Sequence, residues 1–303
     1  MIYKAVCFVF SSKGAAMKGH KGKNKNIVIA AAVILSTSAF LTAALWQGLT
    51  VTRYVEVTDK VKKPVRLLML SDLHGMVFGK DQSGLINLID QNRPDIIMLC
   101  GDIADDKNNN AGARLLLENI GKRYLCFYVT GNHECYHPDG EQKIKDMVAS
   151  YGVHVLTGGS EVVEVNGQKV RVCGVDDPDR FLDPNTGRTD GWEDLLEAAK
   201  PKQDDGLYNI LLSHRPERAE QYKNCGFDLV LCGHTHGGQV RLPFINGLYA
   251  PHQGFFPEYA GGSYDLDGTR MIIGRGLQKI AVPRVFNPPE VVVVDLRPVD
   301  ENG

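Results

Sequence analysis

The body of the chain alternates short apolar runs with stretches of helical periodicity. Apolar runs typical of buried strands occupy 65–70, 96–100, 125–129, 209–212 and 229–232. Apolar residues recur with a helical period over 83–91, 113–120, 142–150, 192–199 and 217–224. Because strands and helices follow one another in this way, the sequence predicts an α/β body without an internal domain boundary.

The middle and the end of the body depart from simple alternation. The segments 153–156, 161–165 and 169–175 predict a β-meander, with Asn166 and Gly167 in a type I′ turn. The last two strands, 270–273 and 291–296, come after the helices. Their position predicts a second sheet instead of an extension of a simple doubly wound one.

The N-terminal region has the features of a membrane-targeting segment. Residues 27–46 carry no charge, and a bilayer-spanning helix needs about 20 such residues. The first 25 residues hold six lysines and no acidic residue, which favours a cytoplasmic N-terminus. We expect a signal anchor, because the apolar run is longer than the core of a usual secretory signal. A cleaved signal peptide, with small residues near 42–44, and a buried core helix are the alternatives.

These features divide the chain into four parts. They are a basic cytoplasmic tail (1–26), a transmembrane signal anchor (27–46), a juxtamembrane segment with edge-strand character (47–64) and a catalytic body (65–297). Met17 precedes a lysine-rich stretch that looks like a normal signal n-region, so it is a second candidate for the translation start. We expect a single-pass protein of the cytoplasmic membrane with an extracytoplasmic body.

Composition narrows the class of protein further. The 303 residues are 43% hydrophobic and 23% charged, which is typical of a globular protein. Acidic residues outnumber basic ones (36 to 34), and six of the basic ones lie in the lysine-rich tail, so the body is acidic. An acidic body disfavours a nucleic-acid partner. The seven cysteines show no framework spacing, and those in apolar runs are expected to be buried thiols.

Polar residues that bind metals follow the apolar runs. They are Asp72 with His74, Asp102, Asn132 with His133, His214, and His234 with His236. In α/β sheets, ligand sites lie beyond the carboxyl ends of the strands, so we expect these side chains to meet. An isolated His-x-His would also suit an ordinary loop, but the repeated placement favours a site.

The chemistry of this set indicates two divalent metal ions. Imidazole, carboxylate and amide ligands without a thiolate suit Mn, Zn or Fe better than a cysteine-rich zinc site. The set is larger than one such ion takes from protein. Two ions about 3.5–4 Å apart, sharing a carboxylate and a bridging hydroxide, would aim that hydroxide at a phosphoryl group.

The order and spacing of these motifs resemble the calcineurin-like metallophosphoesterase family. Thirty residues separate Asp72 from Asp102, and thirty more separate Asp102 from Asn132. The resemblance covers about 65–296 and implies a four-layer α/β/β/α sandwich of two mixed β-sheets. It also implies metals at the strand ends.

The resemblance implies a role for each residue. Asp72, His74 and His236 would bind one metal, and Asn132, His214 and His234 would bind the other. Asp102 would bridge the two and take part in catalysis. His133 would be the catalytic residue that faces the substrate, stabilising developing charge or protonating the leaving oxygen. The alternative for His133 is to orient a ligand.

Two further stretches refine the expected activity. Ile103 to Asp106 stand where protein Ser/Thr phosphatases carry Asp-Arg-Gly, which argues against protein phosphatase activity. Whether a carboxylate such as Asp105 is the partner of His133 stays open. The segments 237–241, 274–277 and 288–290 are similar to the membrane-anchored bacterial YkuE/YaeI-type phosphodiesterase branch. That branch includes enzymes that cleave a lipid-linked pyrophosphate.

Two arginines and three aromatic residues are further candidates. Arg241 and Arg275 are candidates for binding a substrate phosphate, with ordinary salt bridges as the alternative. Phe255, Phe256 and Tyr259 would line an apolar pocket, form a lipid-facing rim or pack in the core.

The sequence therefore predicts a membrane-anchored dinuclear-metal phosphoesterase. Its expected substrates are phosphodiesters or pyrophosphates, lipid-linked ones among them. The alternatives are a phosphomonoesterase, a nuclease and a non-catalytic interaction protein of the same fold. Because the chain keeps His133 and every expected ligand, the sequence favours an enzyme.

Overall fold

The computed structural model describes residues 20–107, 110–202, 205–242, 244–278 and 284–299, with side chains from Lys25 onward in the first helix. The chain forms two compact units, Met1–Ala44 and Leu45–Gly303. The expected basic tail up to residue 19, including Met17, lies outside the described residues.

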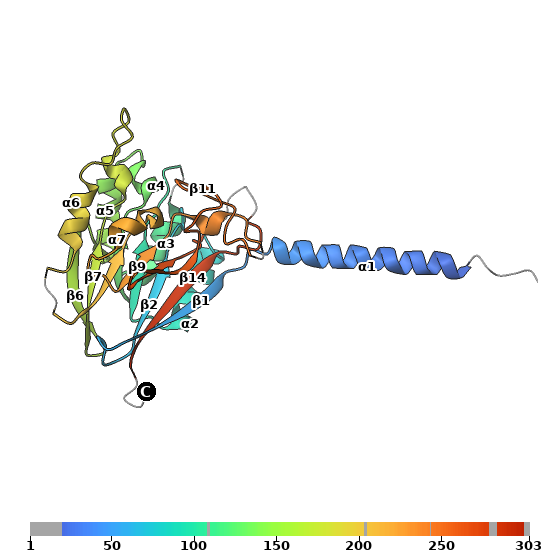
Figure 1. The fold of residues 1–303 in the computed structure, drawn as a ribbon, viewed down its shortest axis with the longest axis horizontal. Coiled ribbons are helices and arrows are strands. Elements are labelled where there is room, and N and C mark those ends of the chain that lie inside the picture. The colour runs from blue at the N-terminus through green and yellow to red at the C-terminus, as the bar shows by residue number, and fades with distance from the viewer. Residues whose placement is uncertain (1–19, 108–109, 203–204, 243, 279–283, 300–303) are drawn as a thin grey trace, which may run out of the picture. The chain divides into compact units, whose positions relative to one another are not determined.

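The first unit contains one long helix, α1 (His20–Ala44) (Figure 1). Its segment Lys25–Ala44 is long and apolar enough to cross a membrane, with a mean hydropathy of 2.2. Only 6% of that segment is buried. A core helix of a soluble protein would be mostly buried, so this alternative does not fit, whereas a membrane anchor and a signal sequence both do.

Two mixed sheets form the second unit. The first has the order β1 (Thr50–Thr58), β14 (Glu290–Pro298), β2 (Val65–Leu70), β3 (Ile96–Cys100), β4 (Leu125–Val129), β5 (His154–Val155). The second has the order β12 (Gly262–Leu266), β13 (Thr269–Ile273), β9 (Leu229–Cys232), β8 (Tyr208–Leu212), β7 (Gln168–Gly174), β6 (Gly159–Val165). β2 to β5 run parallel, as do β7, β8, β9 and β13. A small hairpin, β10 (Tyr249–Ala250) with β11 (Gly254–Phe255), stands apart from both sheets.

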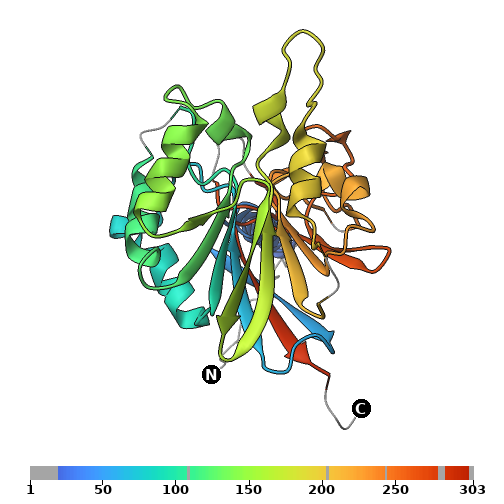
Figure 2. The ribbon, with the colours of Figure 1, turned by 90° about the vertical axis from the view of Figure 1, so that its left-hand side faces the viewer.

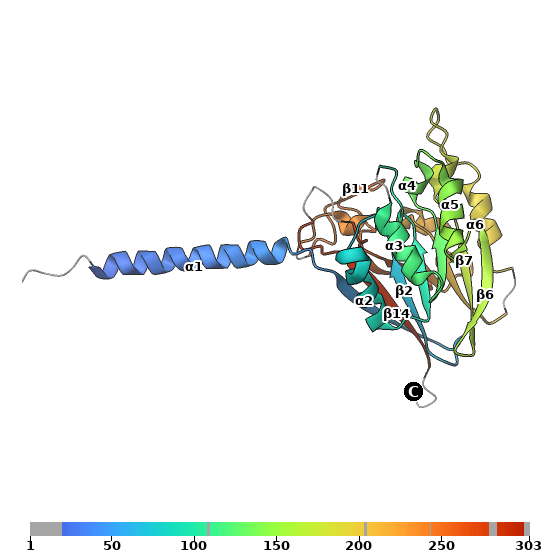
Figure 3. The same ribbon diagram turned by 180° about the vertical axis from the view of Figure 1, so that it is seen from behind.

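Helices cover the outer face of each sheet (Figures 2 and 3). α2 (Ser83–Asn92), α3 (Ala111–Ile120) and α5 (Glu141–Ser150) pack on the first sheet. α6 (Trp192–Ala199) and α7 (Ala219–Tyr222) pack on the second. Short helical turns complete the unit: η1 (Lys80–Gln82), α4 (Asn132–Cys135), η2 (Pro178–Phe181), η3 (Pro216–Arg218) and η4 (His236–Gly238).

Alternate side chains along an inner strand pack on opposite faces of its sheet. In β2, Leu68 and Leu70 face the cluster under the helices, while Leu67 and Met69 face the cluster between the sheets. Because both faces of the strand are buried, its sequence is continuously apolar. The arrangement confirms the predicted four-layer α/β/β/α sandwich of two mixed sheets.

Two expectations about the strands and one about a helix were wrong in detail. β5 does not join a meander, because it pairs in parallel with β4 in the first sheet. β14 also belongs to the first sheet, where it lies between β1 and β2 (Figure 1). The expected helix 217–224 is split into η3 and α7. The hairpin β6–β7 does have its turn at Asn166 and Gly167, with φ of 53° and 72°, as a type I′ turn requires.

The segment expected to be juxtamembrane is part of the sandwich. β1 pairs along its whole length with β14, so residues 50–58 form the edge of the first sheet. The predicted edge-strand character is confirmed, but the body begins before residue 64. Sequence periodicity could not show this, because the partner of β1 lies at the other end of the chain.

Candidate active site

The predicted ligands come from parallel strands whose carboxyl ends meet. β2, β3 and β4 are neighbours in one sheet, and β8 and β9 are neighbours in the other. The loops that follow are tied by backbone hydrogen bonds, such as Asp72 N to Gly101 O (3.1 Å) and Gly233 N to His214 O (3.2 Å). Glycine is required at 101, since a Cβ there would lie 2.5 Å from His214 Nδ1.

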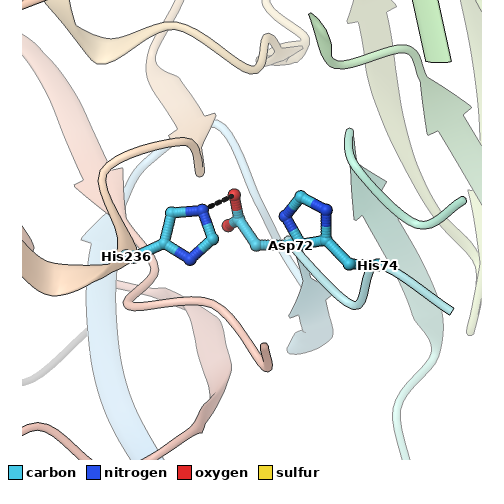
Figure 4. Close-up of side chains that lie close together, drawn as sticks. All are labelled: Asp72, His74 and His236. Carbon is cyan, nitrogen blue, oxygen red and sulfur yellow. Dashed lines mark ion pairs between the residues drawn. The ribbon is translucent and has the colours of Figure 1, made fainter. Parts of the chain in front are cut away.

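One group of side chains consists of Asp72, His74 and His236 (Figure 4). Their potential ligand atoms all lie within 4.8 Å of one another. The Asp72 carboxylate lies between the two rings, with Oδ1 3.6 Å from His236 Nε2. The two imidazoles stack with their centroids 5.3 Å apart. These are the three residues that the resemblance assigns to one metal.

A second group consists of Asp102, His214 and His234, again with ligand atoms within 4.8 Å. Asp102 Oδ2 is 3.1 Å from His214 Nε2 and 3.6 Å from His74 Nε2. Asp102 therefore lies between the two groups, as a bridging ligand would. Asn132 begins α4 at the end of β4, next to the Asp102 loop.

Hydrogen bonds on the outer side of the rings fix their orientation. His214 Nδ1 lies 2.8 Å from Cys100 O, and His74 Nδ1 lies 3.0 Å from Asp105 Oδ2. A carbonyl oxygen can only accept, so His214 donates from Nδ1, and its Nε2 faces Asp102. The Asp105 carboxylate orients His74 in the same way.

Buried acceptors in the site lack hydrogen-bond partners among the described residues. Asp72 Oδ2, Asn132 Oδ1 and His236 Nδ1 are among those that belong to the predicted ligand set. A buried polar atom left without a partner costs about 1–3 kcal/mol. Oxygen and imidazole nitrogen are the ligands that divalent ions such as Mn, Zn and Fe accept, so the residues fit two such ions.

The surroundings shift the pKa values of two site histidines in opposite directions. Burial opposes protonation of His214, but the adjacent Asp102 carboxylate outweighs it and raises the pKa of His214 to about 10. Burial, together with the charges of His74 and Arg284, lowers the pKa of His236 to about 4. Burial would raise the pKa of Asp102, yet the His214 imidazolium holds it well below its usual range.

Several of the predicted ligands have left-handed backbone conformations. The φ angles are 51° at Asp72, 48° at His74, 51° at Asp102, 71° at His234 and 49° at His236. Positive φ is uncommon outside glycine, and such outliers gather at functional sites. An extended backbone would point both rings of the His-x-His pair to the same side, but the structure shows that this segment is not extended. Its left-handed turns send His234 to the group with Asp102 and His236 to the group with Asp72.

His133 stands beside the two groups with a carboxylate partner of its own. Its Nδ1 is 2.6 Å from Asp106 Oδ1 and 4.0 Å from Asp105 Oδ2. Its ring meets the His74 ring edge-on, with the centroids 4.5 Å apart, and its side chain is 26% exposed. The partner of His133 is thus Asp106, which the sequence analysis did not single out, while Asp105 serves His74.

Glu134 is a further residue whose role the sequence did not reveal. It is fully buried, and its carboxylate accepts hydrogen bonds from the N–H groups of Gly131 (2.8 Å), Asp102 (2.9 Å) and Ala104 (2.9 Å). Burial and the nearby Asp102 charge raise its pKa to about 7. The side chain joins the loops after β3 and β4. Its position directly after His133 in the sequence could have marked Glu134 as a candidate site residue.

Arg215 and His252 flank the second group and were not predicted. Arg215 is 1% exposed and donates to both oxygens of Asp177, at 2.6 and 2.8 Å. Its Nη1 lies 2.8 Å from His252 Nδ1, which in turn lies 3.0 Å from His234 Nε2. Both residues line a cavity of about 350 Å³. Arg215 directly follows His214 in sequence, whereas His252 is brought in only by the turn of the β10–β11 hairpin.

The two arginines expected to bind phosphate differ in their surroundings. Arg275 forms an ion pair with the buried Glu290 at 2.8 Å. Arg241 donates from Nη2 to Asn246 Oδ1 at 2.5 Å. A third arginine, Arg284, is buried beside them and donates to the Gln278 carbonyl at 2.8 Å. The salt-bridge alternative describes Arg275, and Arg241 is the better placed to meet an added anion.

Comparison with known proteins agrees with this geometry. The profile of the family described as Calcineurin-like phosphoesterase matches residues 65–238. A metallophosphoesterase of Helicobacter pylori strain J99 is 31% identical over 249 residues, covering 80% of this chain and 62% of that protein. This chain thus spans less than two thirds of that relative's length.

Two shorter bacterial relatives are also similar. Bacillus subtilis YkuE is 28% identical over 241 residues, covering 77% of this chain and 79% of YkuE. The Escherichia coli phosphodiesterase YaeI is 28% identical over 240 residues, covering 77% of this chain and 82% of YaeI. With the strand order, the grouped ligands and the matched profile in agreement, the chain belongs to the calcineurin-like phosphoesterase family.

Proposed function

We propose that the protein is a membrane-anchored, dinuclear-metal phosphodiesterase, with pyrophosphate bonds within its range. The observation that carries this proposal is the position of Asp102 between two ligand groups, with Oδ2 3.1 Å from His214 Nε2 and 3.6 Å from His74 Nε2. One carboxylate shared by two imidazole-rich groups is the arrangement that a two-metal hydrolase needs.

The chain's own residues have distinct tasks in this proposal. Two bound divalent ions would neutralise phosphoryl charge and make water nucleophilic at neutral pH. Asp72, His74 and His236 would hold one ion, while Asn132, His214 and His234 hold the other. The hydrogen bond from the His133 amide N–H to Asp102 Oδ1, at 2.9 Å, fixes the bridging carboxylate.

His133 is proposed to act on the substrate itself. Its ring lies against that of His74, yet its side chain keeps access to solvent, so a bound phosphate can reach it. With Nδ1 held by Asp106, the other ring nitrogen, Nε2, is left for the leaving oxygen. A histidine oriented by a carboxylate in this way can donate a proton as the ester bond breaks.

Two cavities beside the site support a diester over a monoester. One, of about 880 Å³, is lined by Asp106, Asn110 and Arg114, among others. The other, of about 350 Å³, is lined by Arg215 and His252. The first lies on the His133 side and the second on the His234 side. A phosphodiester carries two substituents, and each cavity can receive one.

The N-terminal helix supports a place at the membrane. Lys25–Ala44 has the length and composition of a membrane span, and the lysines before it favour an N-terminus inside the cytoplasm. We therefore propose an uncleaved anchor that holds the body on the extracytoplasmic side. A lipid-linked phosphoester would be within reach of such a body.

The test uses the full chain in detergent, stripped with a chelator and reloaded with Mn, Zn or Fe in turn. Each form is assayed on bis-p-nitrophenyl phosphate and on p-nitrophenyl phosphate, and bound metal is counted by elemental analysis. We expect two ions per chain and faster cleavage of the diester. Faster monoester cleavage would replace the proposal with a phosphatase, and a chain that binds no metal would refute it.

A further inference from the structure

The segment after the last ligand pair exposes large apolar side chains to solvent. They are Leu242 (43% exposed), Phe244 (108%), Tyr249 (45%), Phe255 (71%) and Phe256 (68%), and we call them the aromatic face. Scattered apolar residues are normal on a protein surface, but five within fifteen positions of one short segment are not. Tyr259, by contrast, packs against the core under α6 and α7.

Backbone hydrogen bonds hold the segment that carries the aromatic face. Leu248 N donates to Val240 O at 2.9 Å, and Phe256 N donates to Leu248 O at 2.9 Å. The rings of Tyr249 and Phe255 meet edge-on, with centroids 5.4 Å apart. These bonds hold the segment in place with its phenyl rings exposed. The rings could become buried in the core only if the bonds were broken.

The aromatic face adjoins the place where the chain enters the body. Gln47 Nε2 donates to Arg284 O at 2.8 Å, and Arg241 N donates to the next carbonyl, Val285 O, at 2.9 Å. Only residues 45–49 separate the end of α1 from β1. Five residues span at most about 18 Å when extended, so the link between the apolar helix and the body is short.

We propose that the aromatic face is a bilayer-contact surface that rests in the interfacial region of the membrane. Phenylalanine and tyrosine favour that region because it is apolar on one side and wet on the other. In an anchored chain, the short link would keep the bilayer within reach of these rings. The proposal rests on the membrane anchoring in the proposed function and is independent of catalytic turnover.

The same hairpin connects this surface to the active site. Tyr249 and Phe255 belong to β10 and β11, and His252 in the turn between them lies 3.0 Å from His234 Nε2. Contact with the bilayer would therefore place the His234 side of the site near the lipid headgroups. This favours, as substrate class, a phosphoester whose headgroup projects from the same membrane.

The experiment measures the depth of the face directly. The full chain carries Trp46→Phe, which leaves the buried Trp192 as the native tryptophan, and either Phe255→Trp or, as the matched control, Val162→Trp. Val162 is 50% exposed on β6, at the edge of the second sheet. Each variant is reconstituted in phosphatidylcholine vesicles with and without lipid that carries a doxyl quencher at carbon 5.

We expect quencher lipid to reduce emission from Trp at 255 and to leave emission from Trp at 162 unchanged, since interfacial side chains sit about 5–10 Å deep. Equal quenching at both positions, or none at 255 in chains that float with the vesicles, would overturn the contact surface alone. Chains that fail to float with vesicles would overturn the anchoring. A concentration-dependent shift at 255 without lipid quenching would assign the face to a second copy of the chain instead.

A second variant separates contact from chemistry. Phe255→Ser with Phe256→Ser should retain both bound metals and full activity on bis-p-nitrophenyl phosphate in detergent. It should lose activity on a diester embedded in vesicles, whereas Val162→Ser should not. If the double variant cleaves the embedded diester as fast as the parent chain, the aromatic face has no part in bringing the body to the membrane.

Discussion

His133 Nδ1 lies 2.6 Å from Asp106 Oδ1, while the neighbouring carboxylate of Asp105 turns to His74 Nδ1 at 3.0 Å. Adjacent acidic residues thus orient two different histidines: His133, which is proposed to face the substrate, and His74, which belongs to a ligand group. Each of the two histidines therefore has its own carboxylate partner. This arrangement allows the proposed proton donor to be altered without disturbing the ligands.

We expect Asp106→Asn to lower kcat by about 10–100-fold, because residues that orient a functional histidine contribute on this scale. His133→Ala should cost about 100-fold or more, as loss of a general acid does. Both variants should keep two bound metals, measured by elemental analysis beside steady-state kinetics. The matched control is Asp105→Asn, which should weaken metal binding instead. Loss of metal in His133→Ala would contradict the role given to this histidine.

Removing the shared carboxylate should abolish turnover. Asp102→Asn takes a negative charge from between the two groups and leaves His74 and His214 without their common partner. His234→Ala removes one ligand from the second group only. We expect undetectable diester cleavage in both, with both ions lost in Asp102→Asn and at least one retained in His234→Ala. A variant at 102 that keeps two metals would show that this carboxylate does not bridge.

The partly exposed His252 should affect substrate binding more than metal content. It touches Arg215 and His234 from the cavity side, and 51% of its side chain is exposed. We expect His252→Gln to raise KM for the diester several-fold while kcat and metal content stay near those of the parent chain. Titration of KM and bound metal in one preparation checks this. An unchanged KM would show that His252 does not contribute to substrate binding.

The two arginines considered for phosphate binding should respond differently to substitution. Arg275→Gln leaves the buried carboxylate of Glu290 without its ion pair, and breaking a buried pair costs about 3–5 kcal/mol. We therefore expect a clear loss of thermal stability. Arg241 has no ion pair among the described side chains, so Arg241→Gln should leave the Tm near the parent value and raise KM. Equal losses of Tm would contradict this distinction.

The metal-free protein should be most stable near the ordinary pKa of histidine. The raised pKa of His214, about 10, stabilises the fold fully below pH 6.5, and this contribution is lost as the pH rises toward 10. The lowered pKa of His236, about 4, acts in the opposite sense, so stability is lost as the pH falls from 6.5 to 4.

Thermal melts of chelator-treated protein from pH 4 to pH 10 test both limbs. His214→Gln should flatten the alkaline limb, and His236→Gln should flatten the acid limb. Each variant serves as the control for the other, since the two histidines belong to different groups. An alkaline limb that persists in His214→Gln would show that another group titrates there.

The local pattern of residues specifies the elements and the chemistry at their ends. The apolar runs that became β2, β3, β4, β8 and β9 are buried on both faces, so their composition alone marks them as inner strands. Polar residues that follow such runs stand out for the same reason. The ligand set could therefore be assembled before any contact was known.

Features that depend on partners distant in the chain arise only in the folded protein. β1 joins the first sheet only because β14 pairs with it, and a periodicity of two does not specify a partner. The choice between Asp105 and Asp106 rests on the loop after β3, where a change of one residue reverses the direction of a side chain. His252 reaches His234 through a hairpin turn, and the sequence between them carries no sign of that contact. Local pattern fixes elements and residue types, whereas register, loop direction and long-range pairing arise only when the layers pack.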